Sequence, residues 1–238
     1  IMSELPVILE EFNRDNLMDR EPMPWLAALV CASAFDLALH DAYGVVNKVP
    51  IYKAYGSKYL SSDLSEFLEP ADNSGISFSK KFPADYLVLE PPKHIPVWRL
   101  VGGLDPICED DLTGDEPDDG YPLHLRDWIQ CDGLNCLKIK LRGNDPKWDY
   151  ERLKTIGKVA LELNVEHLTT DFNCTVKEPD YVNDILDRLQ VKHPQIHRLI
   201  LYVEQPFPYD LEKYLINVES VSKRKPLFMD ESAHDWKH

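Results

Sequence analysis

Charged residues lie in or close four successive short apolar runs of this chain, and this pattern constrains the fold more than any other. Lys138 and Lys140 lie in the first run, and Asp171, Glu204 and Asp230 end the next three. Side chains at the carboxyl ends of strands converge if the strands are parallel neighbours, as in a barrel with catalytic groups at those ends. Asp171 and Glu204 are 33 residues apart, and Glu204 and Asp230 are 26 apart, so each interval fits one strand and one helix. The pattern predicts a parallel α/β fold.

The chain changes character near residue 96, and we predict a domain boundary between 1–95 and 96–238. From Pro96 onward, short apolar runs alternate with helical stripes, which is typical of repeated βα units. We expect five strands near 97–101, 136–141, 167–172, 199–204 and 226–230. We expect helices between them over 148–163, 181–189 and 211–221.

The region before residue 96 predicts a different organisation. Apolar residues recur at helical spacing from Trp25 to Tyr43, and Gly44 is expected to end that helix. A second, short helix is expected from Ile51 to Tyr55. The stretch from Ser57 to Ile95 is polar and rich in proline, and its length suggests that it contains strands.

Composition excludes several classes of partner. A net charge of -15 and a pI near 4.9 argue against binding to nucleic acid or anionic lipid, since both need clustered Lys and Arg. Five irregularly placed cysteines do not resemble a disulfide framework, so we expect a reducing compartment, the cytoplasm. The longest apolar stretch, 25–39, is interrupted by Asp36 and is too short to span a bilayer, so we expect no membrane insertion.

Lys138 and Lys140 share one strand parity, so both ammonium groups point the same way, which is inward in a closed barrel. Two like charges side by side usually lower a lysine pKa, from ~10.4 toward ~7–8, which suits a general base. The alternative is that both side chains extend from an exposed strand edge into water.

The three carboxylates strengthen the catalytic interpretation. Asp171, Glu204 and Asp230 would repel one another without a cation, and an all-oxygen ligand set at a barrel mouth favours a hard ion, Mg²⁺. Asn173 has the parity of Asp171 and could hydrogen-bond a metal ligand or water, or act as a turn residue. The alternative for any single acid is that it caps a neighbouring helix.

These motifs resemble those of the enolase superfamily, and within it the muconate-lactonizing enzyme and mandelate racemase-like family. The family's K-x-K, D-x-N, E-Q-P and D-E-S motifs are similar to residues 138–140, 171–173, 204–206 and 230–232. Residues 34–41, followed by 50–52 and Gly56, are similar to the helical part of the family's capping domain. His40 stands where the family commonly has Trp, a departure that we expect to concern packing only.

The resemblance implies an incomplete TIM-type (β/α)7β barrel, with about five strands present, preceded by part of an α+β capping domain. It implies that Lys140 is the acid/base, that Lys138 is its electrostatic helper, and that Asp171, Glu204 and Asp230 are ligands of Mg²⁺. We expect the opposite acid/base of the family, a lysine or a His/Asp pair, to fall beyond His238.

The implied activity is that of a Mg²⁺-dependent lyase or isomerase that abstracts the proton α to a substrate carboxylate through an enediolate intermediate. Cycloisomerases, epimerases or racemases, and acid dehydratases share that step. The expected partner is a small carboxylic acid, and we expect a homo-oligomer at full length. Two alternatives stay open: a noncatalytic metal- or ligand-binding barrel homologue, and a purely structural barrel.

Overall fold

The computed structural model describes residues 4–16 and 21–233, and the chain divides into two compact units, 1–93 and 94–238. The first unit is helical in its described residues. It contains α1 (Leu5–Asn16), α2 (Trp25–Asn47) and three short 3-10 helices, η1 (Ile51–Ala54), η2 (Leu64–Glu66) and η3 (Pro83–Tyr86). The strands expected between 57 and 95 are absent from that segment, so this prediction was wrong.

Gly44 does not end α2, contrary to prediction. The helix continues to Asn47 and is closed by Lys48, which adopts left-handed backbone angles at φ 55°. Gly44 is buried, and a Cβ there would lie 3.1 Å from Val49 O and 3.2 Å from Ile51 Cβ. Gly44 therefore allows residues 49–51 to pack closely against the helix, and the helix itself ends one turn later.

α2 is strongly apolar and largely exposed within its own unit. By length and composition alone it could cross a membrane, and 6% of its apolar window is buried. The expectation that this stretch is too short to span a bilayer was wrong, because the helix has 23 residues. The expected absence of membrane insertion stays a prediction.

The second unit is a parallel α/β structure. Its strands are β1 (Trp98–Val101), β2 (Cys136–Lys140), β3 (His167–Asp171), β4 (Ile200–Glu204) and β5 (Leu227–Phe228). Its helices are η4 (Glu109–Asp111), α3 (Leu125–Asp132), α4 (Pro146–Glu162), α5 (Pro179–Lys192), α6 (Pro194–Leu199) and α7 (Glu219–Ser222). All five strands pair in parallel in the order β1-β2-β3-β4-β5. This confirms the α/β class and the five predicted strands.

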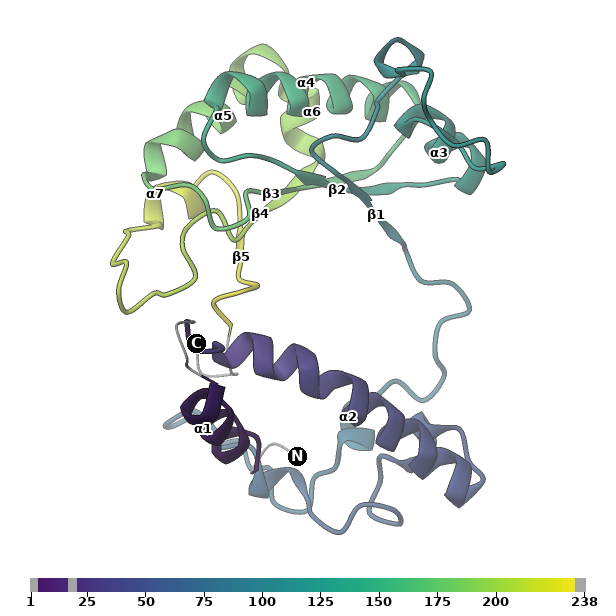
Figure 1. Cartoon of the computed structure of the whole chain (residues 1–238), viewed down its shortest axis with the longest axis vertical. Helices are drawn as coiled ribbons and strands as arrows, with labels where there is room; N and C mark the ends of the chain where they lie inside the picture. Colours follow the sequence, from purple (N-terminus) through teal and green to yellow (C-terminus); the bar gives the residue numbers. More distant parts are fainter. Residues whose placement is uncertain (1–3, 17–20, 234–238) are drawn as a thin grey trace. The chain divides into compact units, whose positions relative to one another are not determined.

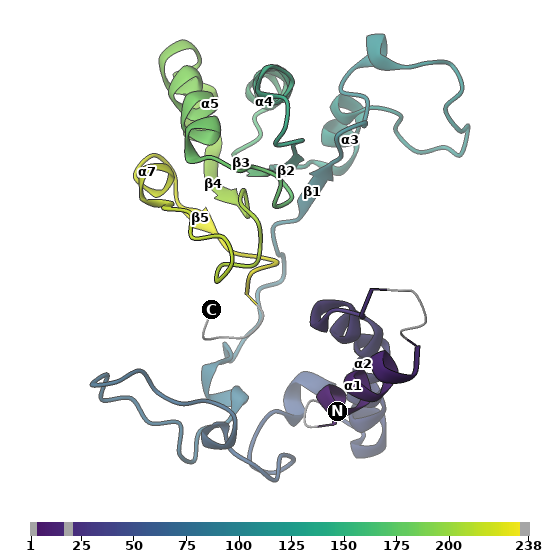
Figure 2. The ribbon, with the colours of Figure 1, turned by 60° about the vertical axis from the view of Figure 1, so that its left-hand side comes forward.

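The helices cover one face of the sheet, and the strands follow a curve with α3, α4 and α5 on its outer side (Figures 1 and 2). Leu137 and Ile139 of β2 are fully buried toward those helices, together with Leu153 and Ile156 of α4 and Ile185 of α5. Fully burying such a side chain contributes about 1.5–3 kcal/mol, so this layer stabilises the unit. Because side chains alternate along a strand, Lys138 and Lys140 lie on the opposite face.

The third predicted helix, 211–221, is wrong over most of its length. Only α7, Glu219–Ser222, is helical there. Asp210 Oδ1 accepts a hydrogen bond from Lys213 N at 3.0 Å and closes a turn, and Leu215 is 89% exposed. The local hydrogen bond competes with the helix. Of the apolar stripe, only Val221 in α7 is buried in the core, whereas Leu211, Tyr214, Leu215 and Val218 are exposed.

Candidate active site

The parallel register brings the charged strand ends to one level of the sheet. Lys140 of β2 pairs with Asp171 of β3, and Asp171 pairs with Glu204 of β4. The two carboxylates are 1% and 3% exposed. Side-chain exposure of Lys138 is 25% and that of Lys140 is 27%. The carboxylates at this level of the sheet are therefore buried, and the two lysines are partly exposed to solvent.

Both lysines form ion pairs with these acids. Lys138 Nζ lies 2.6 Å from Glu204 Oε1 and 3.1 Å from Asp171 Oδ2, and Lys140 Nζ donates to Asp171 Oδ2. A pair of lysines in water at an exposed edge would not make such contacts. Of the two sequence alternatives, the ordered pair is the one observed, on the sheet face opposite Leu137 and Ile139.

Asn173 is both a turn residue and a partner of the site. Its φ is 52°, the left-handed conformation that asparagine tolerates at a strand end. Its Oδ1 accepts from Lys140 Nζ at 2.8 Å, its backbone N donates to Asp171 Oδ1 at 2.8 Å, and its Nδ2 donates to Leu141 O at 3.1 Å. Asn173 thus ties the end of β3 to β2.

The pKa of Lys138, the predicted electrostatic helper, is raised. Burial pulls the pKa of Lys138 down, but its hydrogen bonds to Glu204 and Asp171 outweigh that effect. Burial also opposes ionisation of Asp171, yet hydrogen bonds from Lys140, Asn173 N and Lys138 lower its pKa below the usual range. Carboxylates beside the Lys138 ammonium group favour its charged form.

The surroundings of Glu204 disfavour its ionised form. Burial raises the pKa of Glu204, Lys138 opposes that shift, and the charge of Asp171 and a hydrogen bond with Asp230 raise the pKa further. The interaction with Asp230 places the acid after β5 beside the acid that ends β4. All three predicted acids therefore lie at the same end of neighbouring strands.

The donor chemistry of these acids fits a hard cation, since all three supply carboxylate oxygen. Within residues 4–16 and 21–233, however, no group of three or more His, Cys, Asp or Glu side chains is arranged to hold a metal ion. The Lys138 ammonium pairs with both Asp171 and Glu204, two of the three acids predicted as ligands. The assignment of the three acids as Mg²⁺ ligands stays a prediction.

Gln205 is a structural member of the site that the sequence reasoning missed. It is 1% exposed, and its Oε1 accepts from Asp230 N at 3.0 Å, Ser232 N at 3.3 Å and Ser232 Oγ at 2.8 Å. Its Nε2 donates to Phe207 O at 3.1 Å. Gln205 therefore shapes the turn that carries Asp230. The signal available was a polar amide directly after a strand-ending acid.

Cys174 follows Asn173, and its thiol is poorly suited to nucleophilic chemistry. Burial, followed by the negative charge and a hydrogen bond of Glu231, raises the pKa of Cys174 to about 12. A thiol with this pKa stays protonated near neutral pH and is a weak nucleophile. The chemistry of the site therefore rests on lysine and carboxylate groups.

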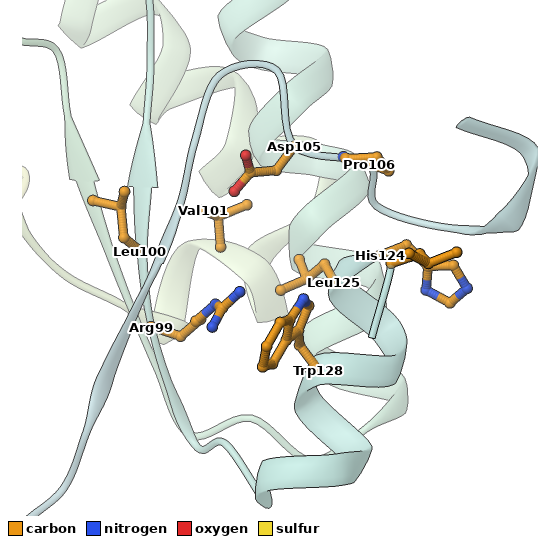
Figure 3. Close-up of a pocket in the computed structure, with 9 residues that line it drawn as sticks. Arg99, Leu100, Val101, Asp105, Pro106, His124, Leu125 and Trp128 are labelled. Carbon is orange, nitrogen blue, oxygen red and sulfur yellow. The ribbon is translucent and has the colours of Figure 1, made fainter. Parts of the chain in front are cut away.

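A cavity of about 170 Å³ lies beside β1 and α3 (Figure 3). The Arg99 guanidinium lies 3.8 Å from the centre of the Trp128 ring at this cavity. Arg99 pairs with Leu137, whereas the neighbouring Leu100 pairs with Lys138. Because of this register, Arg99 belongs to the helix-covered face of the sheet, and the sheet separates it from the lysine and carboxylate cluster.

The sequence matches no family model, and it matches no curated protein. Among solved structures, it is similar to a mandelate racemase/muconate lactonizing protein from Herpetosiphon aurantiacus, with 22% identity and a TM-score of 0.37. That match covers 45% of this chain and 28% of the other. It is also similar to a mandelate racemase/muconate lactonizing enzyme from Roseiflexus sp., with 28% identity, a TM-score of 0.36, and coverage of 45% and 29%. The chain thus matches less than a third of the length of each of these proteins.

Proposed function

We propose that this chain belongs to a Mg²⁺-dependent lyase or isomerase of the enolase superfamily, similar to mandelate racemase and muconate-lactonizing enzymes. Its reaction would begin with removal of the proton α to a substrate carboxylate. The observation that carries the proposal is the placement of Lys138 and Lys140 against Asp171 and Glu204 at the carboxyl ends of parallel strands. Active sites of barrels built from such strands lie at this end.

Lys140 is the proposed base. In its neutral form, Nζ would accept the α-proton as the C–H bond breaks, and the bonding electrons would pass into the substrate carboxylate to give an enediolate. Asp171 and Asn173 both accept hydrogen bonds from Nζ, so they would hold the amine in place and stabilise the ammonium group after transfer. Holding the Lys140 amine in place lowers the entropic cost of reaching the reactive geometry.

Lys138 has a different proposed role. Its raised pKa keeps the ammonium group charged near neutral pH, so it suits a donor to the substrate carboxylate and not a base. A fixed positive charge at that place would favour the negative charge that develops on the carboxylate oxygens. The two lysines of β2 thereby have different roles: Lys140 loses its proton to act as the base, and Lys138 stays charged.

Asp171, Glu204 and Asp230 are the proposed holders of Mg²⁺. When bound, the ion would stabilise the additional negative charge on the substrate carboxylate. Burial, and after it the charge of Asp171 and a hydrogen bond with Asp230, raise the pKa of Glu204, and a cation beside this group would favour its ionised form. Gln205 would support this ligand set through its hydrogen bond to Asp230 N.

The test is exchange of substrate α-protons with deuterated solvent, measured by NMR on the full-length protein with Mg²⁺. The probes are panels of 2-hydroxy acids, N-acyl amino acids and unsaturated diacids. We expect exchange for at least one class and its loss in Lys140→Ala. The matched control is Lys158→Ala, an exposed lysine on α4, which should exchange like the wild type. Equal exchange by Lys140→Ala and the wild type would refute the assignment of the base.

A second candidate function is that of a noncatalytic homologue that binds a metal or a ligand. The pairing of Lys138 with two of the three proposed metal ligands favours it. Calorimetry separates the cases: this homologue would bind Mg²⁺ and show no exchange with any probe. A purely structural barrel would bind no Mg²⁺.

The remaining expectations are part of the same proposal. We propose a small carboxylic acid as substrate, a homo-oligomer at full length, a cytoplasmic location, and no binding to nucleic acid or membranes. The net charge of -15 supports the absence of nucleic-acid binding, because phosphate backbones repel such a surface. The five cysteines are all free, which is compatible with a reducing compartment.

A further inference from the structure

We propose that Asp149 is a positioning residue for Lys140, acting through the backbone that follows β2. This inference rests on the proposed function of Lys140. Asp149 lies on α4 and is fully buried. Its Oδ1 accepts from Arg142 N at 2.8 Å, and its Oδ2 accepts from Gly143 N at 2.9 Å and from the Tyr181 hydroxyl at 2.6 Å.

The Asp149 carboxylate has three hydrogen bonds and, among the described residues, no ion pair with a cationic side chain. Burying a carboxylate without a cation is costly unless hydrogen bonds replace its water. Two of the three donors are the consecutive amides of Arg142 and Gly143, which lie two and three residues after Lys140. The loop that follows β2 therefore supplies two of the three hydrogen bonds that hold the Asp149 carboxylate.

The same loop is attached on its other side to the end of β3. The Thr175 hydroxyl lies 2.8 Å from Arg142 O, and Asn173 Nδ2 donates to Leu141 O. Gly143 has φ +69°, and a Cβ there would collide with Thr175 Oγ1. Backbone that is fixed by Asp149 from one side and by Asn173 and Thr175 from the other has little freedom to move.

Lys140 is the last residue of β2, directly before the loop segment 141–143 that is hydrogen-bonded from both sides. Its ammonium group is held by Asp171 and Asn173, and Asn173 also bonds the loop. A shift of residues 141–143 would therefore move the Lys140 backbone relative to both partners of Nζ. Lys138 lies two residues further back, within the parallel pairing of β2 and β3. It should respond less to a change at Asp149.

The test compares Asp149→Asn with the wild-type full chain by hydrogen exchange and by acetylation with N-acetoxysuccinimide, read by mass spectrometry. An amide side chain has one acceptor oxygen and places an NH₂ group against a backbone donor. We expect exchange in a peptide that covers Arg142 and Gly143 to rise by roughly tenfold, the size expected for an unsatisfied buried group. We expect acetylation of Lys140 to rise several-fold relative to Lys138, which uniform loosening would not produce.

Tyr181→Phe is the second variant, because it removes one donor and keeps both amide bonds to Asp149. We expect a smaller change in the same direction, and this variant keeps the test decisive if Asp149→Asn does not fold. Faster exchange at 142–143 with an unchanged ratio of Lys140 to Lys138 acetylation would overturn the inference. Neither readout needs substrate or turnover. Absence of α-proton exchange in the wild type would thus refute the proposed function while these measurements still decide the positioning role.

Discussion

Lys138 Nζ lies 2.6 Å from Glu204 Oε1, so an ammonium group from β2 reaches across β3 to the acid that ends β4. On the way it also pairs with Asp171 of β3, at 3.1 Å. One cation thus links three adjacent strands. Buried acids that share a cation depend on it, and this dependence leads to measurable predictions about stability, pH and metal binding.

Asp171→Asn should destabilise the protein by about 3 kcal/mol, because it leaves two partly buried ammonium groups without their shared carboxylate. The measurement is the free energy of unfolding from urea titration at neutral pH. The control is Glu219→Gln, which removes a pair with Lys223 whose two side chains are 70% and 66% exposed. The control should change nothing measurable. Equal effects of both substitutions would contradict a structural role for the Asp171 pairs.

Glu204→Gln should change how stability depends on pH. The pKa of Glu204 is raised in the folded state, so the folded protein binds this proton more tightly than the unfolded chain. Its contribution to stability therefore falls as pH rises from the ordinary value of 4.5 through the raised pKa. The difference in unfolding free energy, Glu204→Gln minus wild type, should increase with pH across this window. A difference that decreases would show that the pKa is lowered.

Asp171 should act in the opposite direction. Its pKa is lowered, so its stabilising contribution is present above 3.8 and is lost as pH falls through the folded-state pKa. In Asp171→Asn, the loss of stability on acidification below pH 3.8 should be smaller than in the wild type. Unfolding free energies of both proteins across this range provide the measurement.

Gly143→Ala should destabilise the protein by about 3 kcal/mol. The substitution imposes a left-handed conformation on alanine, at about 1–2 kcal/mol, and forces the new methyl group against Thr175. Gly133→Ala is the matched control: its φ is +62°, similar to +69° at Gly143, and nothing lies within 4 Å of the added carbon. It should cost only the conformational part. Equal losses of unfolding free energy for both variants would show that the Thr175 side chain moves aside without an energetic cost.

Gln205→Met should weaken binding of Mg²⁺, because it removes the acceptor for Asp230 N and both donors of Ser232. We expect a loss of affinity of about tenfold by calorimetry, in the range typical for residues that orient metal ligands. Ser232→Ala removes one donor and leaves the bond to Asp230 N, so its effect should be smaller. Unchanged Mg²⁺ affinity in Gln205→Met would show that the turn after β5 does not contribute to metal binding.

Local periodicity determined the main elements of the second unit. Alternation along β2 separates Leu137 and Ile139 from Lys138 and Lys140, and this alternation is a property of any strand. The strand ends at Lys140, Asp171 and Glu204 follow from short apolar runs at intervals of one βα unit, so their convergence was predictable from spacing. The segment from 211 to 218 was not, because a turn at Asp210 replaces the helix there and the stripe residues of this segment stay exposed.

Only the tertiary structure decided what surrounds each charge. Sequence places Lys138 beside another lysine, whereas the fold places it between Glu204 and Asp171, and hydrogen bonds to these carboxylates raise its pKa against the opposing effect of burial. Gln205 follows the strand-ending Glu204 and Asp149 follows Trp148 in the chain, yet only folding surrounds them with donors from Gly143, Tyr181 and Ser232. Electrostatic energy and hydrogen bonding depend on distances of a few ångströms between segments far apart in sequence, and chain spacing alone does not define those distances.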